Sequence, residues 1–152
     1  MGKFFAMLAS IIFIAATPAG AQQQQQKMPV YATQVLVGTW QLVKFQDSNG
    51  TVIRPDNPAN YTLDFDDKGH IAVRFDCNQG SGTWGTASKG EIHFGPLAIT
   101  LAECPKGSLH NRLVKDWPLI RSYTQQNGQL FLALAAEGGS YHFEPVGPRK
   151  RQ

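Results

Sequence analysis

Two cysteines are the residues of this chain whose chemistry is easiest to read. Cys77 and Cys104 are the only cysteines among the 152 residues. Their spacing fits neither a zinc site nor a CxxC redox motif. In an oxidising compartment two such cysteines usually pair, and a bridge between them is worth about 3–4 kcal/mol of stability. We therefore expect a disulfide, with two unpaired buried thiols as the alternative.

Four histidines are the next candidates for acid–base or metal chemistry, and none pairs with another at metal-ligand spacing. They are His70, His93, His110 and His142. His93 and His142 fall on the polar phase of their segments, which predicts a surface position, although the two could still meet across adjacent strands. No serine stands in a GxSxG motif and no spacing nominates a carboxylate pair. We expect no catalytic residue, no metal site and no cofactor.

Two segments resemble binding motifs but fail on chemistry. Residues 80–85, GSGTWG, match the dinucleotide pattern GxGxxG, yet no helix or βαβ unit follows. We interpret these glycines as places where the backbone bends tightly beside Cys77. Residues 64–69 begin like a calcium loop, but Lys68 stands where an oxygen ligand belongs and Phe75 replaces the bidentate glutamate. Those acids belong to a solvated hairpin turn.

The dominant period of apolar residues is two, which is the period of β-strands with one buried face. In the first such segment Trp40, Leu42 and Lys44 alternate with Thr39, Val43 and Phe45. The same alternation occurs in residues 61–66, 71–76, 92–94, 130–134 and 141–143. Short Asn-Gly and Gly-containing turns separate these segments, so neighbouring strands must be antiparallel. Seven or eight such strands predict an all-β barrel or sandwich.

One segment follows a helical period instead. Leu109, Leu113 and Trp117 recur four residues apart, and Ser108 is a suitable N-terminal cap. Pro118 disfavours helical geometry at the residue before it, so the predicted helix is short, covering residues 109–116. A short helix between strands can close the end of a barrel. We assign its apolar stripe to the core.

The N-terminal residues have the order of a secretory signal. Lys3 precedes an apolar run over residues 4–16, and Ala19-Gly20-Ala21 offers a cleavage site before Gln22. Thirteen apolar residues are about 20 Å of helix, too short for a bilayer core of about 30 Å, so we expect no stable membrane insertion. We predict residues 1–21 as a signal peptide and residues 22–34 as a Gln-rich disordered leader. The protein is then expected in the periplasm or secreted.

Composition excludes several classes of protein. Hydrophobic residues make up 42% of the chain and charged residues 16%, which fits a globular domain and not a coiled coil or a charge-driven disordered chain. The net charge is +3, and three positive residues lie in the tail of residues 148–152. A tail of this length is typical of a solvated chain end. We expect one domain over residues 35–147, a monomer, and no nucleic-acid partner.

A set of motifs in this chain resembles the META domain family, the HslJ-like proteins of the bacterial envelope. The resemblance is carried by residues 74–80 with their Cys-Asn pair, by Gly38 and Trp40 in the opening strand, and by Thr100 four residues before Cys104. Residues 130–143 resemble the closing hairpin of the family. Two features depart from the family: many members have Gly at positions 73 and 76, and some carry a lipid-anchor cysteine.

The resemblance implies a small antiparallel barrel of lipocalin-like topology, with Gly38, Trp40, Asn78, Gly80 and Thr100 as structural motif residues. It also implies a non-enzymatic role in envelope stress tolerance. Two alternatives remain, a secreted or periplasmic protease inhibitor and a small lipocalin-like ligand carrier. A cavity of a few hundred Å³ inside the barrel would favour the carrier. The ligand or envelope partner is unknown at this stage.

Overall fold

The structure, a computed structural model, describes residues 35–147. The predicted signal peptide (1–21), leader (22–34) and basic tail (148–152) lie outside these residues. The strands are β1 (Gly38–Gln46), β2 (Val52–Ile53), β3 (Tyr61–Phe65), β4 (His70–Phe75), β5 (Asn78–Gly85), β6 (His93–Phe94), β7 (Ala98–Ile99), β8 (Ile120–Gln126), β9 (Gln129–Leu134) and β10 (Ser140–Pro145). The helical elements are η1 (Pro58–Asn60), α2 (His110–Asp116) and η2 (Trp117–Leu119).

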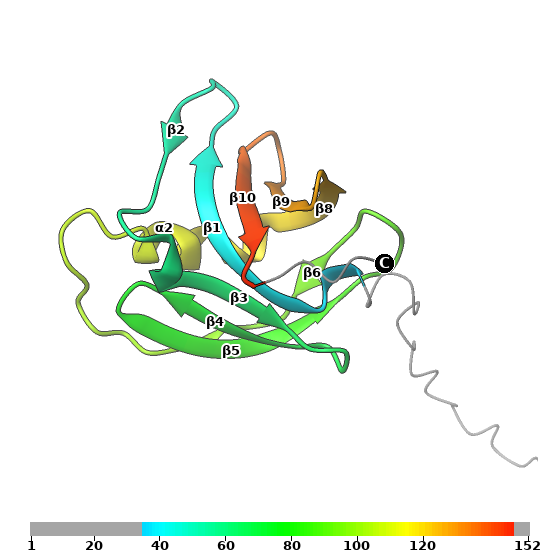
Figure 1. The fold of residues 1–152 in the computed structure, drawn as a ribbon, viewed down its shortest axis with the longest axis horizontal. Coiled ribbons are helices and arrows are strands. Elements are labelled where there is room, and N and C mark those ends of the chain that lie inside the picture. Colours follow the sequence, from blue (N-terminus) through cyan, green and yellow to red (C-terminus); the bar gives the residue numbers. More distant parts are fainter. Residues whose placement is uncertain (1–34, 148–152) are drawn as a thin grey trace, which may run out of the picture.

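The strands form one antiparallel sheet that curls into a nearly closed barrel (Figure 1). The order around the barrel is β6-β5-β4-β3-β1-β10-β9-β8, while β2 pairs with β1 and β7 pairs with β5. The two ends of this order meet through the residues just before β6. The Ile92 N–H donates to the Arg121 carbonyl at 3.0 Å, and the Tyr123 N–H donates to the Gly90 carbonyl at 2.8 Å. The predicted all-β barrel is therefore confirmed.

Alternation along the strands places the core as the sequence predicts. The apolar residues at alternate positions of β3, β4, β9 and β10 are less than 5% exposed: Tyr61, Leu63, Phe65, Ile71, Val73, Phe75, Leu130, Leu132, Tyr141 and Phe143. The exception is β1, where a bulge shifts the register between Leu42 and Lys44. Phe45 is consequently buried at 1% exposure, and Lys44 does not follow Trp40 and Leu42 into the core. The predicted phase was wrong at this position because a bulge inserts one extra residue into the alternation.

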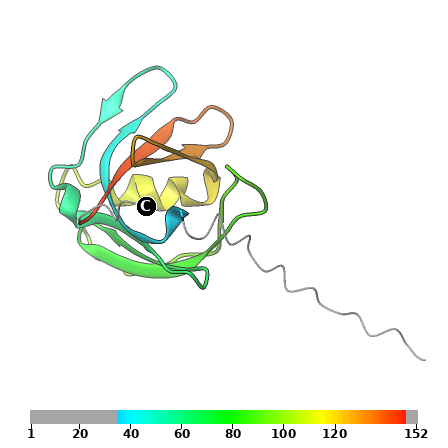
Figure 2. The same cartoon turned by 45° about the vertical axis from the view of Figure 1, so that its right-hand side comes forward.

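The helix forms where the apolar period of four predicts it, within one residue of the expected start. Leu109, Leu113 and Trp117 are all buried. The N-cap residue is Leu109, so Ser108 lies one residue before the expected cap position. Its hydroxyl accepts a hydrogen bond from the His110 N–H at 3.2 Å. Figure 2 shows α2 between the two halves of the barrel wall, so its apolar stripe completes the core. No helix in residues 35–147 has the length and hydrophobicity needed to cross a bilayer.

Large aromatic side chains pack against one another inside the barrel. Trp117 packs against Phe94, with ring centroids 4.2 Å apart, and against Phe75 at 5.8 Å. Phe65 meets the edge of Trp84 at 5.1 Å. The indole N–H groups of both tryptophans donate to backbone carbonyls, so these large side chains are buried without an unpaired donor.

Candidate functional site

Three of the family-like motif residues, Asn78, Gly80 and Thr100, lie at or beside the first part of β5. Asp76 and Cys77 form the two-residue turn between β4 and β5, with Phe75 paired to Asn78. Asp76 has φ +61°, a conformation that Asp, Asn and Gly tolerate best. Gly, which the resemblance drawn from the sequence places at this position in many relatives, adopts this left-handed backbone without strain. The turn places Cys77 outward and Asn78 inward.

Asn78 is fully buried and its side-chain amide binds the loop that follows β7. Its Nδ2 donates to the Ala102 carbonyl at 2.9 Å, and its Oδ1 accepts the Ala102 N–H at 2.7 Å. The Thr100 hydroxyl also donates to Oδ1, at 2.8 Å. The side-chain amide thus pairs with the backbone of Ala102 as a neighbouring strand would. The Asn78 amide thus holds the irregular loop after β7 at a place where β7 no longer pairs with β5.

The Cys77–Cys104 disulfide ties down the same loop. The two Cα atoms are 5.5 Å apart and the bridge closes a separation of 27 residues. Asn78 Nδ2 lies 3.2 Å from the Cys104 sulfur and 3.4 Å from the Cys77 sulfur. Cys77 is exposed, whereas Cys104 is partly covered. The predicted pairing is the one the structure contains. The loop is therefore held by two adjacent residues at the start of β5, Cys77 in the turn and Asn78 in the strand.

The glycines of the GxGxxG segment lie in a strand and make room for the chain that crosses them. A Cβ on Gly80 would collide with the Ala98 carbonyl oxygen and lie 2.8 Å from the Ile99 Cβ. A Cβ on Gly85 would lie 2.6 Å from the His93 ring. Gly80 therefore has a structural role in bringing β7 against β5. This role is a close approach of two strands and differs from the tight backbone bend that the sequence suggested.

The remaining motif residues belong to the opening strand. Gly38 has φ +126°, which an L side chain rarely adopts. Trp40 is 6% exposed, and its indole N–H donates to the Leu36 carbonyl at 2.9 Å. Both residues fix how the chain enters the barrel. They lie on the other side of β3 and β4 from the Asn78 cluster.

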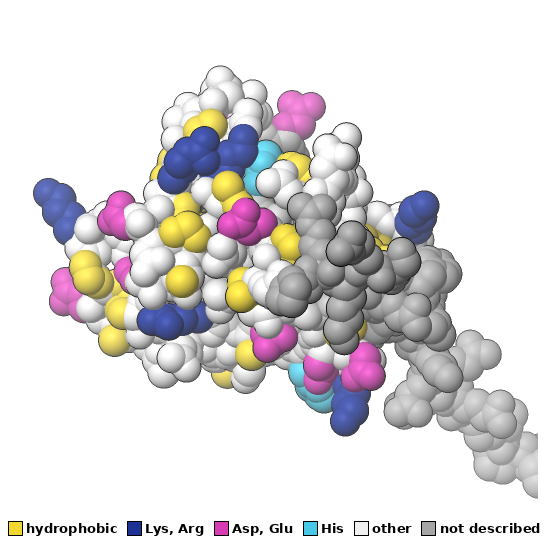
Figure 3. Space-filling model, in the orientation of Figure 1, with side chains coloured by type: hydrophobic (Ala, Val, Ile, Leu, Met, Phe, Trp, Pro, Cys, Tyr) yellow, Lys and Arg dark blue, Asp and Glu magenta, His cyan; other side chains and the backbone are white. Residues whose placement is uncertain are grey.

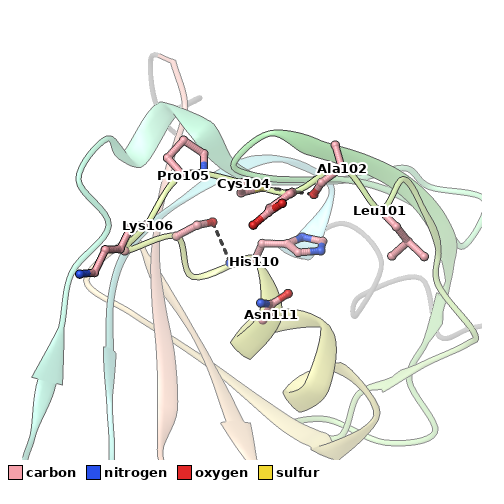
Figure 4. A pocket seen from close by; sticks show the side chains of 10 residues that line it. Leu101, Ala102, Cys104, Pro105, Lys106, His110 and Asn111 are labelled. Carbon is pink, nitrogen blue, oxygen red and sulfur yellow. Dashed lines mark hydrogen bonds between the residues drawn. The ribbon is translucent and has the colours of Figure 1, made fainter.

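A pocket of about 410 Å³ adjoins the Asn78 cluster. It lies between the loop of residues 101–108 and the first turn of α2 (Figure 4). Its walls combine apolar groups, among them Leu101 and Pro105, with polar groups from His110 and Asn111. Leu101 is 81% exposed at the rim. No pattern in the sequence indicates this pocket.

The four histidines lie in different places. His70 Nδ1 lies 3.0 Å from Asp66 Oδ2 in the exposed β3–β4 turn. His93 is exposed on β6, and His142 is half-buried on β10. Since β6 and β10 are not neighbours in the sheet, the predicted alternative in which His93 and His142 meet is wrong. Within residues 35–147, no group of three or more His, Cys, Asp or Glu side chains is placed to hold a metal ion.

Two of the exposed or half-buried groups have shifted pKa values. Desolvation alone would raise the pKa of the Asp66 carboxyl. Hydrogen bonds from the His70 and Lys68 backbones and from the His70 ring outweigh this effect and hold the pKa below its usual range. For His142, partial burial and the nearby charge of Lys44 lower the pKa. Its Nε2 shares a 2.8 Å hydrogen bond with Ser140 Oγ. The hydrogen bonds that Asp66 accepts from the Lys68 and His70 N–H groups stabilise the β3–β4 turn.

One carboxylate lies deep in the molecule. Asp116, at the end of α2, accepts a 2.7 Å hydrogen bond from the Tyr141 hydroxyl and lies 3.7 Å from Arg112. Burial, together with the hydrogen bond to Asp116 and its charge, raises the pKa of Tyr141 far above its usual range. The tyrosine therefore remains a hydrogen-bond donor and links α2 to β10.

Comparison with known proteins shows which family this arrangement belongs to. The META domain model matches residues 33–145, which include the opening strand, the Cys-Asn turn and the closing hairpin. The chain belongs to the META domain family. No curated protein matches it in sequence.

Solved structures share the fold of this META domain. A protein from Burkholderia xenovorans, solved by NMR, is 20% identical with a TM-score of 0.63, over 89% of this chain and 100% of the other. A DUF4847 family protein from Bacteroides vulgatus, solved by crystallography, is 15% identical with a TM-score of 0.54, over 74% of this chain and 94% of the other. At these identities the likeness establishes the fold alone.

Proposed function

We propose that this META domain protein is a non-enzymatic accessory of the bacterial cell envelope that acts through its outer surface. The observation that carries the proposal is the filled barrel interior. Leu42, Leu130, Leu132 and Tyr141 are all 0% exposed, and the aromatic rings described above pack among them. A packed interior leaves the surface and its pocket as the place where a partner or ligand is recognised.

Export supports the same role. The predicted signal peptide of residues 1–21 would deliver the chain to the periplasm or the exterior. An oxidising compartment favours the Cys77–Cys104 bridge that the structure contains. Family membership adds the envelope context, within which we propose a contribution to stress tolerance.

The surface charge pattern agrees with a protein or small-molecule partner. On the face shown in Figure 3, basic and acidic side chains are interspersed and do not gather by sign. Binding to nucleic acid needs a basic patch or stripe, which this face does not display. Hydrophobic side chains on this face are also scattered, which is ordinary for a soluble domain surface.

A deletion strain tests the proposal. Cells lacking the gene are challenged with heat and with envelope-acting antibiotics, then complemented with the full gene, a version lacking residues 2–21, or a version with His70, His93 and His142 replaced by Ala. We expect rescue by the first and third versions only. Rescue by the signal-less version contradicts an envelope role, and failure of a folded, exported His variant points to catalysis or metal binding instead.

A further inference from the structure

The pocket beside the Asn78 cluster contains a buried polar atom without a partner. His110 is only 6% exposed, and among the described residues its Nδ1 has no hydrogen-bond partner. In Figure 4 the imidazole ring extends from the start of α2 toward Ala102 and Leu101, across the pocket. Leaving a buried polar atom unpaired costs about 1–3 kcal/mol, so native proteins rarely keep one without a reason. Because His110 belongs to the lining of the pocket, the pocket is the place to look for a partner for this ring.

The walls of the pocket are fixed before any ligand arrives. Asn78 and the disulfide hold residues 102–104 on one side, as described above. On the other side the Leu109 N–H donates to the Tyr61 hydroxyl at 3.0 Å, and that hydroxyl lies 3.4 Å from Ser108 Oγ. A preorganised pocket loses little conformational entropy when it binds a ligand. Its volume of about 410 Å³ lies within the usual range for small-molecule sites.

We propose that this pocket binds a small carboxylate that lies beside an apolar group, either a free acid or the C-terminal end of a peptide. A neutral or charged imidazole can donate from Nδ1 to a carboxylate oxygen, and the Asn111 amide adds a second possible donor. The lining also includes one basic and one acidic residue, Lys106 and Glu103. Leu101 and Pro105 provide apolar contacts for the rest of the ligand.

This inference goes beyond the proposed envelope role and does not depend on it, because binding is measured with purified mature protein. The probe is N-acetyl-L-leucine, titrated into isotope-labelled protein and followed by NMR. We expect saturable shifts of resonances from residues 101–111. N-acetyl-L-leucinamide, which lacks the charge, should bind at least tenfold more weakly. Acetyl-Ala-Ala-Leu with a free carboxylate distinguishes the two sources: tighter binding than the single residue indicates a peptide end, and weaker binding a free acid.

Variants at His110 separate a binding role from a structural one. His110→Phe keeps the size of the ring and removes Nδ1, so we expect binding at least tenfold weaker and a thermal midpoint equal to or above that of the parent. His110→Asn places an amide near the Nδ1 position and should restore most of the affinity. His93→Phe, on the exposed face of β6, is the matched control and should change neither property.

Three results would overturn the proposal. The first is the absence of saturable shifts with any of the probes. The second is equal affinity for the acid and its amide. The third is unchanged binding in His110→Phe. If that variant also lost stability, the role of Nδ1 would be structural, through a hydrogen bond to water.

Discussion

Removing the Asn78 side chain should destabilise the protein by about 2–4 kcal/mol. In Asn78→Ala, the Ala102 N–H, the Ala102 carbonyl and the Thr100 hydroxyl each lose the partner that now lies 2.7–2.9 Å away. A buried group left unpaired costs about 1–3 kcal/mol. Ala102 and Thr100 are exposed, however, so water replaces part of each lost bond. The estimate is therefore well below the sum of three full penalties.

A second variant at the same position tests the direction of each hydrogen bond. Asn78→Asp keeps an oxygen to accept from Thr100 and from the Ala102 N–H, but its second oxygen faces the Ala102 carbonyl. A protonated carboxyl can donate to that carbonyl and a carboxylate cannot. Burial and the facing carbonyl should therefore raise the pKa of the new carboxyl in the folded state.

The raised pKa makes the free energy of unfolding of Asn78→Asp depend on pH in a definite direction. A carboxyl whose pKa is higher in the folded state than its unfolded value near 3.9 stabilises the folded state fully at pH values below 3.9. This stabilisation disappears as the pH rises through the folded-state pKa. Asn78→Asp should thus lose stability from pH 4 to pH 7, by about 1.4 kcal/mol for each unit of pKa shift. Asn78→Ala should show no such trend relative to the parent.

Urea unfolding followed by tryptophan fluorescence measures these free energies, with the disulfide kept oxidised in every sample. Asn49→Ala, in the exposed β1–β2 turn, is the matched control and should stay within about 0.5 kcal/mol of the parent. A loss below 0.5 kcal/mol for Asn78→Ala would refute the assigned role of the amide. A pH-independent Asn78→Asp difference would refute the assigned hydrogen-bond directions.

Three further predictions concern the bridge, the β5–β7 contact and the β3–β4 turn. Replacing both Cys77 and Cys104 with Ser should cost about 3–4 kcal/mol in urea unfolding, because the bridge closes a separation of 27 residues; parent-like stability would contradict this. Gly80→Ala should lower the thermal midpoint by several degrees, since its Cβ would lie 2.8 Å from the Ile99 Cβ, whereas an unchanged midpoint would show that β7 moves freely. An NMR titration should place the Asp66 carboxyl pKa below its ordinary 3.8, with His70→Ala moving it upward; the stabilisation it provides is present at neutral pH and disappears as the pH falls through that lowered pKa.

The sequence by itself determined the short helix, the Asn-Gly turns and six of the strands, β1, β3, β4, β6, β9 and β10. It did not predict β2, β5, β7 or β8. Alternation is a local property, because side chains at every second position of a strand face the same side. Asn127 and Gly128, with φ +54° and +73°, form the predicted two-residue turn, and both residue types tolerate positive φ. The pairing of Cys77 with Cys104 was equally accessible, because the chain offers no other partner for either cysteine.

Only the tertiary structure decided features that depend on distant parts of the chain. The bulge in β1 is set by pairing with β10, so alternation alone assigned Lys44 and Phe45 to the wrong phases. The contact of Asn78 with Ala102 joins residues 24 positions apart, and nothing near Asn78 names its partner. His110 likewise reads as an ordinary polar residue of a short helix. It becomes a buried, unpaired group because the loop of residues 101–108 folds over it, and such long-range closure leaves no local pattern in a sequence.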